Sequence, residues 1–193
     1  MLHHCAESLT DFLYRHAAIS PQKRPVYVYG IELTLSTSAS FLSIIFFSLL
    51  FSSPLSSFVF LFVFVSLRSF SGGYHAETYR SCFLITNGTY LASFALAKLL
   101  YLSRVVVFGR ALILLSLALI WIWAPITNRH HPLSPRAIRK NRWICRCLML
   151  AETGLIVLLY VNWGNLGLFS CFAASITAVA VMMGISKIKE RRK

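Results

Sequence analysis

Long apolar runs alternate with short polar breaks along this chain. The runs approach the roughly 20 residues that an α-helix needs to cross about 30 Å of hydrocarbon. The pattern predicts six apolar segments, at 31–51, 54–67, 82–102, 105–126, 147–163 and 166–185. We therefore expect an all-α, polytopic membrane helical bundle. The second segment is short for a span, so an alternative keeps four full spans, with the second and fifth segments short or re-entrant.

The first 30 residues contain no long apolar run. Leu9, Phe12 and Leu13 fall at helical spacing, which is typical of an amphipathic helix, and prolines at 21 and 25 are expected to end it. The segment is too polar to hold the apolar core of a secretory signal peptide. The pattern divides the chain into an N-terminal amphipathic or interfacial segment (1–30), a membrane-embedded domain (31–186) and a basic cytoplasmic tail (187–193).

Composition supports a lipid environment. Apolar residues make up 57% of the chain and charged residues only 13%, whereas a soluble domain carries about 25% charge. The net charge of +13 resembles that of nucleic-acid-binding proteins, but the basic residues gather in the polar breaks, including a loop at 127–146. With six spans, all of the 19 Lys and Arg residues except Lys98, Arg104 and Arg110 fall on one side. The positive-inside rule makes that side cytoplasmic, and we expect no nucleic-acid partner.

The cysteine pattern excludes two common roles. The number is odd and no CxxC pair occurs, which argues against a disulfide framework and against a zinc site. His130 and His131 are not followed by further ligands at useful spacing, so we expect no metal and no cofactor. Reduced thiols fit a cytoplasmic location. The five cysteines are Cys5, Cys82, Cys145, Cys147 and Cys171.

One polar break, "RSFSGGYHAETYRSCF" at 68–83, places a His seven residues before a Cys. A thiol is mostly protonated at neutral pH, and a neighbouring His can take its proton to leave a nucleophilic thiolate. In one continuous helix the two residues would lie about 10.5 Å apart along the axis, too far for proton transfer. The chain must therefore bend between His75 and Cys82 if they act together, and Gly72 and Gly73 free the backbone for this. The alternative is that His75 is simply solvated and Cys82 is unreactive.

This break resembles the signature of the AgrB family, membrane cysteine endopeptidases of Gram-positive quorum sensing. The matching residues are Arg68, Gly72, Gly73, His75, Ala76 and Cys82. Two weaker elements agree: "WAPITNRHHPLSPRAIRK" resembles the family's Ala-Pro segment and basic loop, and "VYGIE", ending at Glu32, resembles the start of its first span.

The resemblance implies peptide processing in the cell membrane of a Gram-positive bacterium, with a multi-pass chain whose active site faces the cytoplasm. Family members cut the C-terminal tail from an AgrD-like propeptide and hold the product as a thioester. An internal Cys or Ser then closes a thiolactone or lactone, the cyclic autoinducing peptide. By this resemblance Cys82 is the nucleophile and His75 the general base. A homodimer is a further expectation, beside the lipid bilayer itself.

Other ionisable residues are weaker candidates. Glu32 could orient His75 or bind substrate, or it could be solvated among lipid headgroups. Arg68 and Arg80 could bind a substrate carboxylate or stabilise the thiolate. Glu152 falls inside a predicted span and needs a partner, for which Arg110 is one candidate. The basic residues between 129 and 146 could hold an acidic propeptide tail, or only fix topology.

The sequence leaves two other classes of function open. A small transporter or exporter subunit would move a peptide without proteolysis, using Glu32, Arg110 and Glu152 as pathway residues. A non-enzymatic membrane scaffold would use its basic loops to recruit partners. In both of these functions Cys82 would have no catalytic role.

Overall fold

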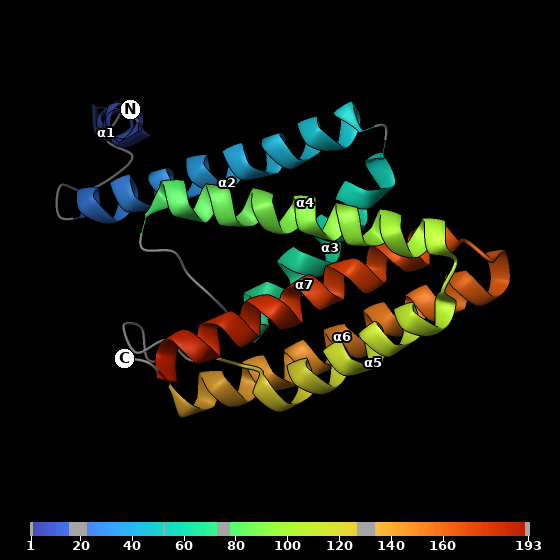
Figure 1. The fold of residues 1–193 in the computed structure, drawn as a ribbon. Helices are drawn as coiled ribbons and strands as arrows, with labels where there is room; N and C mark the ends of the chain where they lie inside the picture. Colours follow the sequence, from blue (N-terminus) through green and yellow to red (C-terminus); the bar gives the residue numbers. More distant parts are fainter. Residues whose placement is uncertain (1, 16–22, 52, 73–77, 127–133, 192–193) are drawn as a thin grey trace. The chain divides into compact units, whose positions relative to one another are not determined.

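The computed structural model describes residues 2–15, 23–51, 53–72, 78–126 and 134–191. All regular structure in these ranges is helical (Figure 1). Six helices, α2 to α7, are long and apolar enough to cross a membrane, which confirms the predicted all-α class and its six apolar segments. The helices are α1 (Leu2–Arg15), α2 (Arg24–Leu50), α3 (Pro54–Ser71), α4 (Tyr79–Ser103), α5 (Val106–Trp123), α6 (Pro135–Trp163) and α7 (Leu166–Arg191).

The chain divides into two compact units. The N-terminal unit consists of residues 1–47 and 76–87, and the core unit consists of residues 48–75 and 88–193. Helix α4 belongs to both, since its first turns lie in the N-terminal unit and the rest in the core unit.

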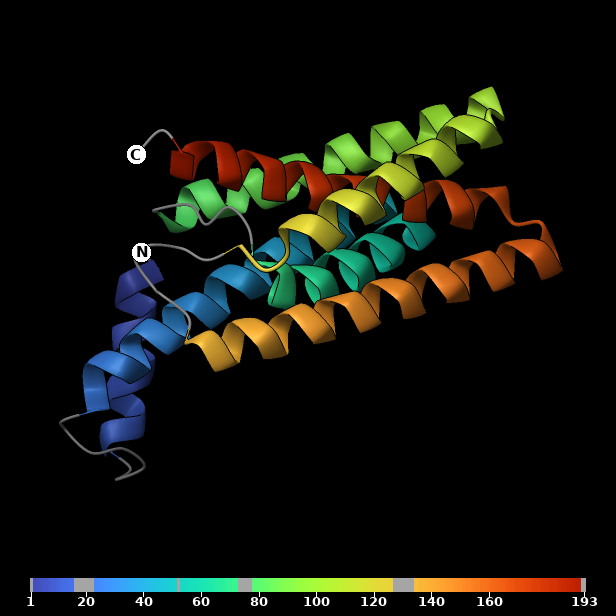
Figure 2. The same cartoon turned by 90° about the horizontal axis from the view of Figure 1, so that it is seen from below.

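Helix α7 is the centre of the core unit. It packs against α3, α5 and α6 (Figure 2). In its most apolar stretch of 18 residues, 67% of the residues are buried inside the protein. Small residues such as Ala173, Ala174 and Ser175 lie fully inside. Because lipid tails are as apolar as the helices, close van der Waals packing between small residues is what holds membrane helices together. This explains why the helix with the most small residues on its contact faces is central.

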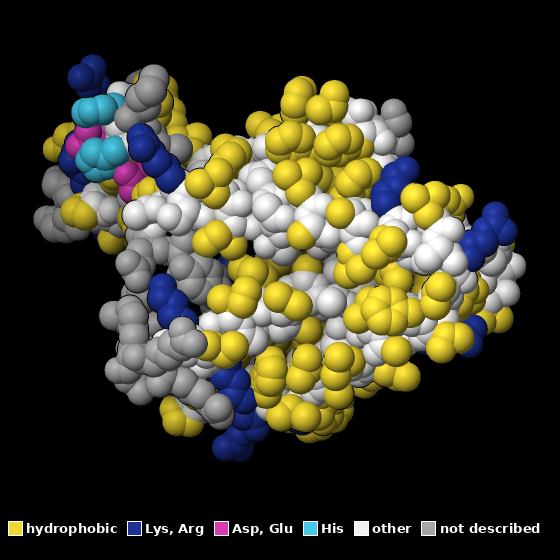
Figure 3. All heavy atoms as spheres, viewed as in Figure 1, with side chains coloured by type: hydrophobic (Ala, Val, Ile, Leu, Met, Phe, Trp, Pro, Cys, Tyr) yellow, Lys and Arg dark blue, Asp and Glu magenta, His cyan; other side chains and the backbone are white. Residues whose placement is uncertain are grey.

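The outer faces of the spans are apolar. Val107, Val161 and Ile122 are each more than 70% exposed. Figure 3 shows hydrophobic side chains spread over the helix faces of the core unit, with Lys and Arg gathered near helix ends. An apolar surface of this extent fits contact with lipid rather than water.

In the N-terminal unit, α1 packs against the first turns of α2. Ala6 and Thr10 are fully buried, and ion pairs join His3 to Glu32 and Asp11 to Arg24. The apolar side chains of Leu9 and Phe12 are about half exposed. The predicted amphipathic helix is therefore present, and its contact with the bilayer surface stays a prediction.

Several predicted helix ends were wrong. Helix α2 begins at Arg24 rather than residue 31, because a proline is well tolerated in the first turn of a helix, and Pro25 opens this one instead of breaking it. The predicted loop at 127–146 is helical from Pro135, with the Ser134 hydroxyl accepting a hydrogen bond from the Ala137 N–H at 3.2 Å. The basic residues after Pro135 suit a helix, since Lys and Arg have high helix propensity.

The remaining ends differ for related reasons. Helix α3 extends to Ser71 and has 18 residues, so the second segment is not unusually short. Helix α4 starts at Tyr79, three residues before the predicted start, and α7 continues to Arg191. Hydropathy marks only the part of a helix that lies in hydrocarbon, so helical turns in the polar boundary are missed. Helix α5 instead ends early, at Trp123, since the residue before Pro125 avoids the helical conformation.

Candidate active site around Cys82

Cys82 is a free, half-buried thiol in the first turn of α4. Thr78 begins this helix: its hydroxyl accepts a hydrogen bond from the Ser81 N–H at 3.2 Å, and its carbonyl oxygen accepts one from the Cys82 N–H at 3.0 Å. The positive end of the helix dipole lies at this turn and favours an anion there.

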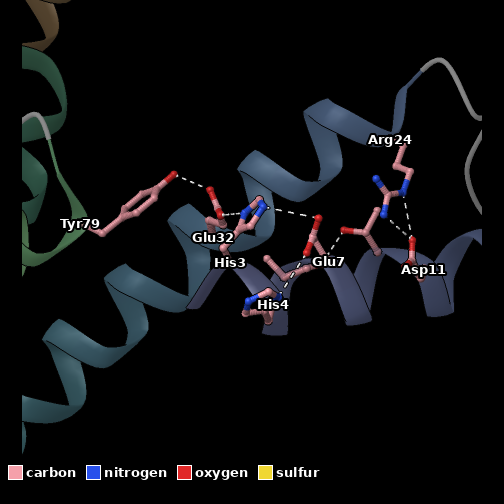
Figure 4. Close-up of polar contacts among 9 residues, drawn as sticks. His3, His4, Glu7, Asp11, Arg24, Glu32 and Tyr79 are labelled. Carbon is pink, nitrogen blue, oxygen red and sulfur yellow. Dashed lines mark hydrogen bonds and ion pairs between the residues drawn. The ribbon is translucent and has the colours of Figure 1, made fainter. Parts of the chain in front are cut away.

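A polar cluster adjoins this turn. The Tyr79 hydroxyl donates a hydrogen bond to Glu32 Oε2 at 2.9 Å, and His3 Nδ1 lies 2.6 Å from Glu32 Oε1. Figure 4 shows the Glu32 carboxylate lying between the two partners, with His3 contributed by α1 and Tyr79 by α4. Tyr79 precedes Cys82 by three residues, so the two share a face of α4. The cluster fixes the first turn of α4 relative to α1 and α2.

Glu32 lies in the third turn of α2, not at its head. Its side chain is only 12% exposed, which rules out the interpretation of a fully solvated carboxylate. Each of its oxygens has one described partner, and a carboxylate offers about four acceptor positions, so a further donor can be accommodated. The expected role of Glu32 in orienting His75 stays untested, because His75 and Gly73 lie outside the described residues.

Sequence reasoning missed two members of this cluster. Tyr79 had a local signal, its helical spacing from Cys82 within "TYRSC". His3 had none, since 29 residues separate it from Glu32 and only the packing of α1 on α2 brings them together.

The other motif residues have separate surroundings. Arg80 is exposed on α4 in the N-terminal unit. Arg68 belongs to the core unit, where its guanidinium lies over the Phe64 ring, 5.2 Å from the centroid. This contact holds the end of α3, and the expected binding of a substrate carboxylate by either arginine stays a prediction.

Gly72 joins two of the motif segments. Its φ of +71° lies in the left-handed region, and a Cβ there would collide with the backbone carbonyl oxygen of Ile126. Next to it, the Ser71 carbonyl oxygen accepts a hydrogen bond from the Ile126 N–H at 2.9 Å. The end of α3 and the Ala-Pro segment after α5 are therefore joined by a backbone contact at Ser71, Gly72 and Ile126. Only glycine at position 72 leaves room for this contact.

Glu152 lies inside the core unit and is 4% exposed. Its Oε1 accepts a hydrogen bond from the Ser66 hydroxyl of α3 at 2.5 Å, and its Oε2 is buried with no hydrogen-bond partner among the described residues. The candidate pairing with Arg110 is wrong: Arg110 is exposed on α5.

The sequence predicted a loop at 127–146, and its described basic residues lie in the first turns of α6 instead. Arg136, Arg139, Lys140 and Arg142 are exposed there. The guanidinium of Arg146 instead stacks on the Trp121 ring, 4.2 Å from its centroid, and donates a hydrogen bond to the Trp121 carbonyl oxygen at 3.2 Å.

Metal ligands do not gather in the described part of the chain. No group of three or more His, Cys, Asp or Glu side chains that could hold a metal ion is found there, and all five cysteines are free thiols. The pair His130 and His131 lies outside the described residues.

Comparison with known proteins supplies the wider context. The family model described as Accessory gene regulator B matches residues 6–185. A protein named "Putative AgrB-like protein 2" from Clostridium perfringens strain 13 is 25% identical over 153 residues, which cover 74% of this chain and 71% of that protein. "Putative AgrB-like protein" from C. perfringens strain SM101 is 23% identical over 152 residues, with the same two coverages. No solved structure matches the chain.

Proposed function

The chain belongs to the accessory gene regulator B family, whose members take part in peptide processing, and we propose that it is a membrane cysteine endopeptidase that removes the C-terminal tail of an AgrD-like propeptide. The observation that carries the proposal is the position of Cys82. It is a free, half-buried thiol in the capped first turn of α4, and a hydrogen bond from Tyr79 to Glu32 holds the same turn in place.

The proposed reaction begins with proton transfer from the Cys82 thiol to His75. The thiolate attacks the scissile carbonyl carbon, the C–N bond breaks, and His75 returns the proton to the leaving amine. The N-terminal part of the propeptide is left as a thioester on Cys82. A Cys thiol or Ser hydroxyl within the propeptide then attacks this thioester, closing a thiolactone or lactone ring and regenerating the Cys82 thiol. A thioester retains acyl-transfer potential, so ring closure needs no ATP.

The half-buried position of Cys82 at the end of a span limits water near the acyl sulfur, which would favour ring closure over hydrolysis. Separately, the exposed cations at the start of α6 offer an electrostatic binding surface to an acidic propeptide tail.

We further propose that Glu32 and Tyr79 are positioning residues. The hydroxyl of Tyr79 and the ring of His3 hold the Glu32 carboxylate on both oxygens, and through Tyr79 this carboxylate steadies the turn that carries Cys82. The six apolar helices support a multi-pass membrane protein. The distribution of basic residues supports an active site that faces the cytoplasm.

The test is to coexpress the chain with its propeptide and to follow the propeptide by mass spectrometry. Cys82→Ala should abolish cleavage, and His75→Ala should nearly abolish it, while both variants remain in the membrane. Cys147→Ala is the matched control, an exposed cysteine on α6 that should process normally. In the active protein, a propeptide variant without its internal nucleophile should accumulate as an adduct on Cys82 that hydroxylamine releases. Normal cleavage by both Cys82→Ala and His75→Ala would favour an exporter instead.

A further inference from the structure

A cavity of about 740 Å³ lies at one end of the core unit. The start of α3, the end of α4 and the segment that leads into α7 surround it, so it lies at the opposite end of α3 from the Gly72–Ile126 contact. A volume of this size is typical of ligand pockets. Nothing in the proposed peptidase chemistry uses this end of the unit.

The charge in this cavity is of one sign. Lys98 and Arg104 line it, and no Asp or Glu does. With six spans, 16 of the 19 Lys and Arg residues fall on one side of the membrane. Lys98 and Arg104 are two of the three that fall on the other side. The N-terminus of α7 opens on the same cavity and adds the positive end of a helix dipole, with the Asn165 side chain accepting a hydrogen bond from the Leu168 N–H at 3.0 Å.

The backbone at Arg104 is also unusual. Its φ of +51° is in the left-handed region, which is unfavourable for a residue with a Cβ. The next helix starts from this turn, with the Val106 N–H bonded to the Arg104 carbonyl oxygen at 2.9 Å. Glycine or asparagine would suit this backbone better, so the arginine is not explained by the turn alone.

Leu55, Phe94, Leu102 and Leu166 form an apolar wall on part of the lining, and Ser53, Ser56 and Tyr101 add hydroxyl groups beside it. A site that has two cations and an apolar wall, and that lies where spans end, matches the boundary between the headgroups and acyl chains of a bilayer. Basic pockets between transmembrane helices hold anionic lipid headgroups at the cytoplasmic face of membranes, and the same attraction between cation and phosphate acts at the opposite face.

We propose that this cavity binds an anionic phospholipid. The phosphodiester lies between Lys98 and Arg104, and the glycerol and upper acyl chains lie against the apolar wall. A free inorganic anion would leave the apolar wall unused, and an acidic peptide would have to place side chains in a pocket that opens at the lipid boundary. The lipid satisfies both parts of the lining, and its binding is independent of the proposed peptidase activity.

The test uses the full-length protein, delipidated in a neutral detergent and titrated with phosphatidylglycerol or phosphatidylcholine. Bound lipid is counted by native mass spectrometry. Phosphatidylglycerol should bind more tightly than phosphatidylcholine. The double variant Lys98→Gln, Arg104→Asn should weaken phosphatidylglycerol binding roughly 25-fold, since each cation near an anionic headgroup contributes about a factor of five. Asparagine suits the left-handed backbone at 104, so the turn is retained.

Two further variants separate the site from general charge effects. Arg110→Gln removes a cation that does not line the cavity and should leave binding unchanged. Asn165→Asp adds negative charge to the lining while keeping an oxygen to accept the Leu168 N–H, so it should weaken binding without lowering the melting temperature. Cys82→Ala should bind lipid normally.

Three results would overturn the proposal. One is equal affinity for the two lipids, and another is equal loss of binding in Arg110→Gln and in the double variant. The third is displacement of bound phosphatidylglycerol by inorganic phosphate alone or by an acidic peptide. Either displacement would assign the cavity to a different ligand.

Discussion

Glu32 and Glu152 are both carboxylates within apolar helices, and their surroundings are opposite. Glu32, in the N-terminal unit, is held between a His and a Tyr near the polar end of α2. Glu152, in the core unit, is almost fully buried, has Ser66 as its hydrogen-bond partner, and keeps one oxygen unpaired among the described residues. The first carboxylate lies in a cluster of titratable groups, whereas the second lies in a packed helix interface.

The difference predicts where each kind of substitution acts. The core unit depends on tight packing around α7, so changes there should reduce stability. The N-terminal unit is joined by polar contacts beside Cys82, so changes there should reduce processing while the protein stays folded. Four substitutions test this division, from the largest expected effect to the smallest.

The largest effect is expected from Glu152→Lys. It places an unpaired cation inside the interface between α3 and α6, at a cost of about 3 kcal/mol. Glu152→Gln is the matched control: a side-chain amide is both donor and acceptor, so it can pair with Ser66 whichever way the hydroxyl proton points. Membrane yield and thermal unfolding in detergent measure both. A Glu152→Lys protein of normal stability would contradict the packed interface.

The next effect is expected from Gly72→Ala. The left-handed φ and the clash with the Ile126 carbonyl oxygen together should cost about 1–3 kcal/mol and reduce processing. Gly154→Ala is the control, because a Cβ there meets no atom within 4 Å and alanine is the better helix former. Its melting temperature should stay the same or rise. Equal behaviour of the two variants would show that the Ser71–Ile126 contact is not needed.

A smaller effect on stability, with a clear effect on activity, is expected from Tyr79→Phe. The change removes one hydrogen bond at a part-buried site and leaves the ring, and because Glu32 keeps His3 as a partner the net loss should be about 1 kcal/mol. We expect processing to fall about tenfold while the melting temperature changes little. Tyr14→Phe, at an exposed tyrosine of the same unit, should process normally. A Tyr79→Phe protein that unfolds before it loses activity would assign this tyrosine to structure.

The smallest effect is expected from Asp11→Asn. The Asp11–Arg24 ion pair has a nitrogen–oxygen distance of 2.8 Å, but both side chains are more than 40% exposed. Exposed pairs contribute only about 0–1 kcal/mol, so melting temperature and processing should both stay near those of the unchanged protein. A large loss would show that α1 is held chiefly by this pair and not by the buried Ala6 and Thr10.

The predictions made from sequence succeeded for features that are local in the chain. The apolar runs predicted six helices because each run is a contiguous apolar stretch of helical length, and the structure has all six. Their ends were missed where the helix continues into polar residues, as at Pro135 and Arg24. The motif at 68–83 located Cys82 correctly at the start of a helix, and its relation to His75 stays a prediction.

The sequence by itself determined the apolar character of the chain, the number of long apolar helices and the reactive side chains present, because each depends on the composition of one contiguous segment. Only the tertiary structure decided that α7 is central, that His3 reaches Glu32, that Ser66 faces Glu152 and that two cations share a cavity at the span ends. These pairings join residues far apart in the chain. In lipid, where every outer face is apolar, hydropathy does not distinguish the face that packs from the face that is exposed.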